Sequence, residues 1–145
     1  MATVYSAEVA VGSWNRIRVK CDYSGTSATL TIQFRRTSSR SDTWSDSNAT
    51  LTFNGQTKGA AYSYSGTVGI SWVDLRPAIS GYTISTSGGT YNWTFNNPGG
   101  SSVLGCSGTL TIPSQGSKPS NGYINDLSTE YSNSVISVKA GQVGV

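Results

Sequence analysis

At 145 residues the chain is long enough for one ordinary domain with some residues left over, and too short for two full domains. Only 12% of the residues are charged, which argues against a long-helix or coiled-coil protein, and the absence of histidine removes the commonest general base. The formal net charge of +3 is mildly basic, and four Trp, eight Tyr and three Phe supply enough apolar surface for a core.

Strands are predicted from the N-terminus onward. The first runs over residues 4–12 and the second over residues 14–23. In the second strand, and again over residues 28–35, apolar side chains alternate with polar or charged ones. This period of two gives a strand one dry face and one wet face. The Ser24–Gly25 turn between these two strands predicts that they pair as a hairpin.

The middle of the chain is less regular. Residues 37–48 show no periodicity and are predicted to form a long exposed loop. Residues 49–53 lead into Asn54–Gly55, a strong hairpin signal because both residues tolerate positive φ. Residues 60–64 are predicted as the returning strand and residues 68–72 as the next one.

A further hairpin is predicted around Ser87–Gly89, from residues 82–84 to residues 91–95, and residues 104–112 form the last predicted strand. Eight or nine short strands predict an all-β fold. We expect an antiparallel β-sandwich, immunoglobulin-like or jelly-roll-like, with a barrel as the alternative.

The sandwich is predicted to occupy residues 1–113. Residues 114–145 are interpreted as a flexible linker and the start of a following module, with docking of this tail onto the sandwich as the alternative.

The two cysteines, Cys21 and Cys106, lie on apolar parities of different strands. They are expected to be buried and, under intracellular conditions, reduced, with a disulfide across the sandwich as the alternative. Two cysteines without histidine make a zinc site improbable, and no metal or cofactor is expected. No export signal or long apolar run is present, so we expect no membrane insertion.

Trp44 is the aromatic residue that a core explains least, because its neighbours are polar and aperiodic. It is predicted to be exposed, and with Asp42, Asp46 and Asn48 it forms a candidate sugar-binding site. Asp42 and Asp46 could also serve as paired carboxylates of a glycosidase, but a Ser/Asp-rich loop is usually a solvated turn. We expect that the chain is not an enzyme. Of the other tryptophans, Trp72 and Trp93 are assigned to the core and Trp14 to an edge.

Basic residues gather in the first third of the chain, and Arg16, Arg18, Lys20 and Arg35 fall on polar parities. On one surface they would attract phosphate or an acidic polysaccharide. The alternative is an ordinary solvated sheet face. No RNA-binding aromatic motif accompanies them, so a nucleic-acid partner is not expected.

A resemblance to a known family comes from the order of these features. A methionine start without an export signal and a basic first third precede Thr109-Leu110-Thr111-Ile112-Pro113-Ser114, a strand that runs into a small-residue linker. This order resembles the N-terminal module of tail-tip minor structural proteins, or antireceptors, of siphophages that infect streptococci. Gln115 and Gly116 stand where that family usually has Arg and Ala.

The resemblance implies a non-catalytic module of a phage tail that contributes to host-cell recognition or tail-tip assembly. Such a protein is made in the host cytoplasm and is located in the virion. Its partners would be other tail proteins or downstream modules of the same chain, together with host cell-surface polysaccharide. A carbohydrate-binding module that uses an exposed Trp44 is the alternative function.

Overall fold

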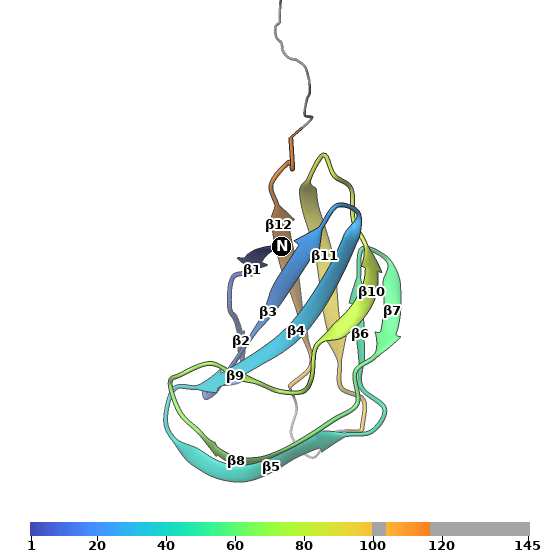
Figure 1. Cartoon of the computed structure of the whole chain (residues 1–145). Helices are drawn as coiled ribbons and strands as arrows, with labels where there is room; N and C mark the ends of the chain where they lie inside the picture. The colour runs from blue at the N-terminus through green and yellow to red at the C-terminus, as the bar shows by residue number, and fades with distance from the viewer. Residues whose placement is uncertain (100–103, 117–145) are drawn as a thin grey trace, which may run out of the picture. The chain divides into compact units, whose positions relative to one another are not determined.

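Two β-sheets and a two-stranded ribbon make up the fold (Figure 1). The computed structural model describes residues 1–99 and 104–116, which contain twelve strands and no helix. The strands are β1 (Ala2–Tyr5), β2 (Val9–Val11), β3 (Asn15–Ser24), β4 (Ser27–Arg36), β5 (Arg40–Asp46), β6 (Thr50–Phe53), β7 (Gln56–Gly59), β8 (Tyr62–Val68), β9 (Val73–Asp74), β10 (Ile79–Thr83), β11 (Gly89–Asn96) and β12 (Cys106–Ile112).

The chain divides into two units, Met1–Pro113 and Ser114–Val145, and every described strand belongs to the first. Residues 117–145 lie outside the described residues. The interpretation of residues 114–145 as a linker and the start of a following module therefore stays a prediction.

The first sheet has the strand order β1-β3-β4-β10, with β2 also paired to β3 and β9 to β4. At its centre β3 and β4 pair antiparallel from Asn15↔Arg36 to Ser24↔Ser27, which confirms the predicted hairpin. Because apolar residues alternate along both strands, the register places all of them on one face.

The second sheet has the order β12-β11-β6-β7. Asn54 (φ 50°) and Gly55 (φ 72°) form the turn between β6 and β7, as their sequence predicts. The returning strand is β7, however, and not residues 60–64. Of those residues, the last three begin β8, which pairs with β5 in the ribbon, while Ala60 and Ala61 precede it.

The core lies between the inner faces of the two sheets. The phenol of Tyr82 on β10 donates a hydrogen bond to the carbonyl of Leu51 on β6 at 2.7 Å, and its ring meets Phe53 edge-on with centroids 5.6 Å apart. These contacts join the sheets, and the prediction of an all-β, antiparallel, sandwich-like fold is confirmed. The largest buried side chains are Trp44, Trp93, Tyr82, Phe34, Phe53, Phe95, Ile17, Leu30, Ile32, Leu51, Leu75 and Leu104.

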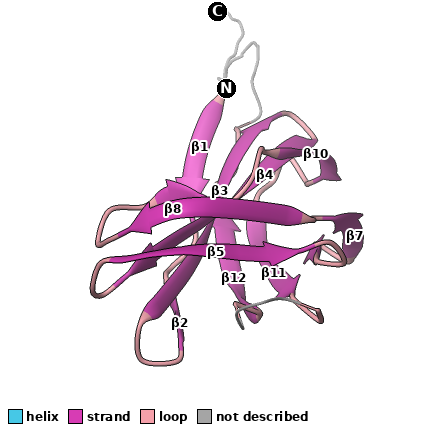
Figure 2. Ribbon diagram, turned by 90° about the horizontal axis from the view of Figure 1, so that it is seen from below, coloured by secondary structure: helices cyan, strands magenta, loops and turns pink. Residues whose placement is uncertain are grey.

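The ribbon of β5 and β8 corrects the prediction that residues 37–48 form a long exposed loop. Figure 2 shows the two strands side by side across the end of the sandwich. On one face of the ribbon lie exposed or half-buried serine and threonine hydroxyls, and on the other Trp44 packs edge-on against Phe34 with ring centroids 5.1 Å apart. The ribbon thus has a period of two that its small polar residues hide in the sequence.

Two other strand predictions were wrong. Residues 82–84 and 91–95 do not form a hairpin, because β10 pairs with β4 while β11 pairs with β6 and β12. The Ser87–Gly89 turn therefore carries the chain from one sheet to the other. Residues 68–72 do not form a strand either, since β8 ends at Val68 and Ile70 is 72% exposed. The described residues hold twelve strands instead of eight or nine, because several are only two to four residues long.

Both cysteines are free thiols. Cys21 is buried as predicted, but Cys106 is only half-buried, because it begins β12 at the edge of the second sheet. Burial raises the pKa of Cys21 to about 11, with the charge of Asp22 adding to the effect, and burial raises that of Cys106 to about 12. Within residues 1–99 and 104–116 there is no helix long and apolar enough to cross a membrane, and no cluster of three or more potential metal ligands.

Candidate functional site

The four predicted basic residues share the outer face of the first sheet. Arg16 pairs with Arg35 across β3 and β4, and Arg18 and Lys20 occupy the next two outward positions on β3. Directly opposed residues of an antiparallel pair point to the same side, so these cations form one surface. The expectation that such a surface attracts phosphate or an acidic polysaccharide stays a prediction.

Arg18 occupies the centre of this surface, between two aromatic rings. Its guanidinium carbon lies 4.2 Å from the ring centroid of Tyr5 on β1 and 4.4 Å from that of Trp72, which precedes β9. Arg35 also lies over the Trp72 ring, at 5.3 Å. Cation–π stacking of this kind fixes the plane of a guanidinium that would otherwise sample many rotamers.

Hydrogen bonds within the sheet face also fix the arginine side chains of this stack. Arg18 donates through Nε to Gln33 Oε1 at 2.8 Å, and Gln33 donates through Nε2 to Asp74 at 2.9 Å. Arg35 forms a bidentate pair with Glu8, in which Nε donates to Oε1 at 3.1 Å and Nη2 donates to Oε2 at 3.0 Å. We call this surface the arginine–aromatic face, and its residues are Tyr5, Glu8, Arg16, Arg18, Lys20, Gln33, Arg35, Trp72 and Asp74.

The two rings keep surface that a ligand can reach. Tyr5 is 49% exposed, and Trp72 is half-buried instead of belonging to the core as its parity with Val68 and Ile70 predicts. Polar donors and acceptors border both rings. Flat apolar surface next to hydrogen-bonding groups is the combination that binds sugar rings, and the guanidinium adds a site for an anion.

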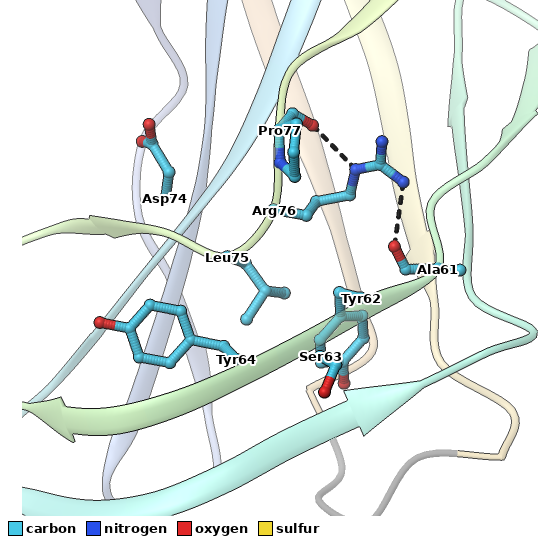
Figure 3. Close-up of a pocket in the computed structure, with 8 residues that line it drawn as sticks. All are labelled: Ala61, Tyr62, Ser63, Tyr64, Asp74, Leu75, Arg76 and Pro77. Atoms are coloured by element: carbon cyan, nitrogen blue, oxygen red, sulfur yellow. Dashed lines mark hydrogen bonds between the residues drawn. The ribbon is translucent and has the colours of Figure 1, made fainter.

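A groove of about 440 Å³ adjoins this face at Asp74 and opens between the start of β8 and the segment that joins β9 to β10 (Figure 3). Its cation, Arg76, donates through Nε to the carbonyl of Pro77 at 2.8 Å and through Nη1 to that of Ala61 at 2.9 Å. In Figure 3 the Arg76 side chain turns toward Ala61, while Leu75 points toward β8. Because two carbonyls already hold Arg76, the groove is a weaker candidate than the arginine–aromatic face.

A second depression, of about 540 Å³, shares Ala61, Tyr62 and Ser63 with this groove and reaches Asp46. Asp46 accepts hydrogen bonds from the backbone N–H groups of Asn48 and Gly99 and is only 3% exposed. Burial, together with the nearby charge of Asp46, raises the pKa of Tyr62 to about 12, although its hydrogen bond to Asn97 acts in the opposite direction. These groups stabilise the end of the ribbon.

The predicted sugar-binding site at Trp44 is corrected by these observations. Trp44 is 1% exposed, because the ribbon turns it inward onto Phe34, and so it offers no face to a ligand. Asp42 lies on the same strand, paired with Arg40 at 2.7 Å, while Asn48 is exposed beyond the strand's end. The four residues therefore do not present one binding surface.

Sequence reasoning missed the aromatic half of the site. Tyr5 and Trp72 lie 67 positions apart along the chain, and only the pairing of β1 with β3 and β9 with β4 brings them to Arg18. Tyr5 pairs with Lys20 and therefore lies on the same face as the basic residues, but this can be seen only once the register of β1 against β3 is known. Comparisons of the chain with models of protein families, with curated proteins and with solved structures found no match.

Proposed function

We propose that the chain is a non-catalytic adhesion module of a phage tail, and that its arginine–aromatic face holds a polysaccharide of the host-cell surface. The resemblance of the sequence to tail-tip modules supports the tail assignment. The stack of Tyr5, Arg18 and Trp72 on an outer sheet face supports the binding role. Host recognition in this form needs a surface that holds a polymer, and no bond has to be broken.

The observation that carries the proposal is the placement of Arg18 between two rings that remain partly open. Core packing does not explain such a stack, because aromatic surface that stays in contact with water does not stabilise the fold through hydrophobic burial. A sugar ring that covers Tyr5 or Trp72 buries this area, while the exposed carboxylate of Asp74, two residues after Trp72, keeps acceptor capacity for a sugar hydroxyl.

The test of binding is co-sedimentation of the purified chain with host cell walls. Trp72→Ala removes one ring of the stack and should weaken binding roughly tenfold, the loss of one aromatic stacking contact. Trp14→Ala is the matched control, because Trp14 is 56% exposed at the turn before β3 and lies outside the stack. If the two variants bound cell walls equally well, the arginine–aromatic face would not be the binding site.

The tail assignment has its own test. Immunogold labelling of intact virions with an antibody against residues 1–113 should place gold at the tail tip. Labelling of the capsid alone, or of no virion part, would reject the assignment. Prolonged incubation with a labelled cell-wall polymer should release no fragments, and release would show that the module is an enzyme.

A further inference from the structure

The guanidinium of Arg18 uses only part of its hydrogen-bonding capacity within the protein. Nε donates to Gln33, while neither Nη atom makes a hydrogen bond within residues 1–99 and 104–116. Tyr5 and Trp72 hold the group from two sides, at 4.2 and 4.4 Å. A fixed guanidinium with open terminal N–H groups matches the geometry of a phosphate or carboxylate, which it binds through two parallel hydrogen bonds.

The neighbouring charges leave two cations without a carboxylate partner. Glu8 pairs with Arg35 at 2.8 Å and approaches Arg16 at 3.8 Å. In the described part of the chain neither Arg18 nor Lys20 has a carboxylate within ion-pair distance. The two residues occupy successive outward positions on β3 and are therefore about 7 Å apart along the strand.

Acidic groups on the same face are already bonded to neutral partners. Asp74 accepts from Gln33, and Asp22 accepts from the hydroxyl of Thr3. With Glu8 they make three acids against the four cations Arg16, Arg18, Lys20 and Arg35, so the face keeps a small positive excess. This excess is concentrated along β3, next to the two rings.

We infer that the polymer bound by this face is anionic, a polysaccharide or polyol chain with phosphate diesters or carboxylates, and that Arg18 and Lys20 bind successive charged groups. The inference rests on the proposed function and deepens it, since it names the class of ligand. A neutral glycan could cover the rings, but it would bring no charge to the open end of Arg18. An anionic chain supplies both sets of contacts.

The experiment measures binding of the full chain to four polymers of similar length: a polyol phosphate, a polyuronate, a neutral glucan and oligothymidylate. Arg18→Gln and Lys20→Gln each remove one cation, and Arg18→Lys keeps the charge but loses the planar fork. Arg40→Gln is the matched control, because Arg40 is 58% exposed and lies on β5 in the ribbon. Circular dichroism of each variant confirms that it is folded.

We expect the polyol phosphate or the polyuronate to bind more tightly than the glucan, and whichever of them binds identifies the source of the anion. Arg18→Gln should weaken this binding at least tenfold, and Arg40→Gln should leave it unchanged. The logarithm of the binding constant should fall with the logarithm of the salt concentration, with a slope of about −0.7 for each ionic contact. For two contacts, a tenfold rise in salt should therefore weaken binding roughly 25-fold.

The outcomes separate the inference from the function on which it rests. If the glucan binds as tightly as the anionic polymers and Arg18→Gln has no effect, the inference of an anionic ligand is wrong, but the proposal of polysaccharide adhesion is not affected. Equal or tighter binding of oligothymidylate overturns the assignment to cell-surface polymers, because it shows a nucleic-acid site. Failure of all four polymers and of host cell walls to bind overturns both proposals.

Discussion

Gly108 on β12 offers the sharpest test of the packing between the strands of the second sheet. It pairs with Trp93 on β11, and a Cβ atom built on it would lie 3.0 Å from Cζ2 and 3.1 Å from both Cε2 and Nε1 of the indole. The φ angle of Gly108 is not in the left-handed region, so this contact alone determines the effect of Gly108→Ala. Trp93 is 1% exposed, so core side chains surround the indole.

Two opposing free-energy terms determine how much Gly108→Ala changes the stability of the fold. Replacing a strand glycine by alanine normally gains about 0.5–1 kcal/mol, because the unfolded chain loses conformational freedom. Forcing a methyl group against a rigid buried ring costs about 1–3 kcal/mol. The difference predicts a net loss of about 1 kcal/mol, equivalent to a fall in Tm of about 4 °C for a domain of this size.

Gly59→Ala is the control. Gly59 ends β7, its φ angle is also ordinary, and nothing lies within 4 Å of a Cβ built on it. This variant should be as stable as the parent or slightly more stable. Urea and thermal unfolding followed by circular dichroism compare the two. If Gly108→Ala were stabilising to the same degree as Gly59→Ala, Trp93 would not pack over Gly108 as described.

Three further predictions concern residues inside the sandwich and the ribbon. Trp44→Ala should destabilise the fold by about 3–5 kcal/mol, measured by urea unfolding, because it leaves a cavity beside the first sheet; a change below about 1 kcal/mol would mean that Trp44 is exposed after all. Asp46→Asn should cost about 1–3 kcal/mol, since the two carboxylate oxygens accept from different backbone N–H groups and Asn keeps only one acceptor oxygen; unchanged stability would contradict its structural role. Burial raises the pKa of Cys21 from 9.0 to about 11 and that of Tyr62 from 10.0 to about 12. The folded state thus holds these protons more tightly than the unfolded chain, so stability is complete below about pH 9 and falls as the pH rises toward about 12. Urea midpoints at about pH 8 and pH 11 measure this loss, and equal midpoints would argue against it.

The centre of the first sheet could be predicted from the sequence, and the ribbon could not. In β3 and β4 apolar residues alternate with polar or charged ones, and a turn separates the strands, so pattern and register agree. In β5 the inward residues Trp44 and Asp46 differ in polarity. The period of two is hidden there, and the segment looks like a solvated loop.

The turn at Ser87–Gly89 shows a second limit of sequence reasoning. Glycines indicate that the chain reverses direction, but they do not determine whether the next strand joins the same sheet or the facing one. Here the facing sheet receives β11, because Trp93 and Phe95 pack into the core opposite the first sheet.

The candidate site divides in the same way. Parity along β3 and β4 was sufficient to gather the basic residues on one face, because it depends on local geometry alone. The aromatic residues come from β1 and from the segment before β9, which are far apart in sequence and have weak patterns of their own. The polar neighbours of Trp44 predict an exposed side chain, yet polar neighbours are equally compatible with a strand that has one buried face.

The central claim is that Trp72 and Arg18 form the surface that holds the ligand. Two-dimensional NMR of the indole N–H groups tests it directly, because the chain contains four tryptophans, at positions 14, 44, 72 and 93. On addition of host cell-wall polymer, the Trp72 signal should shift while those of Trp14, Trp44 and Trp93 stay in place. A polymer that binds and shifts Trp14 alone, or leaves all four signals unchanged, would contradict the account.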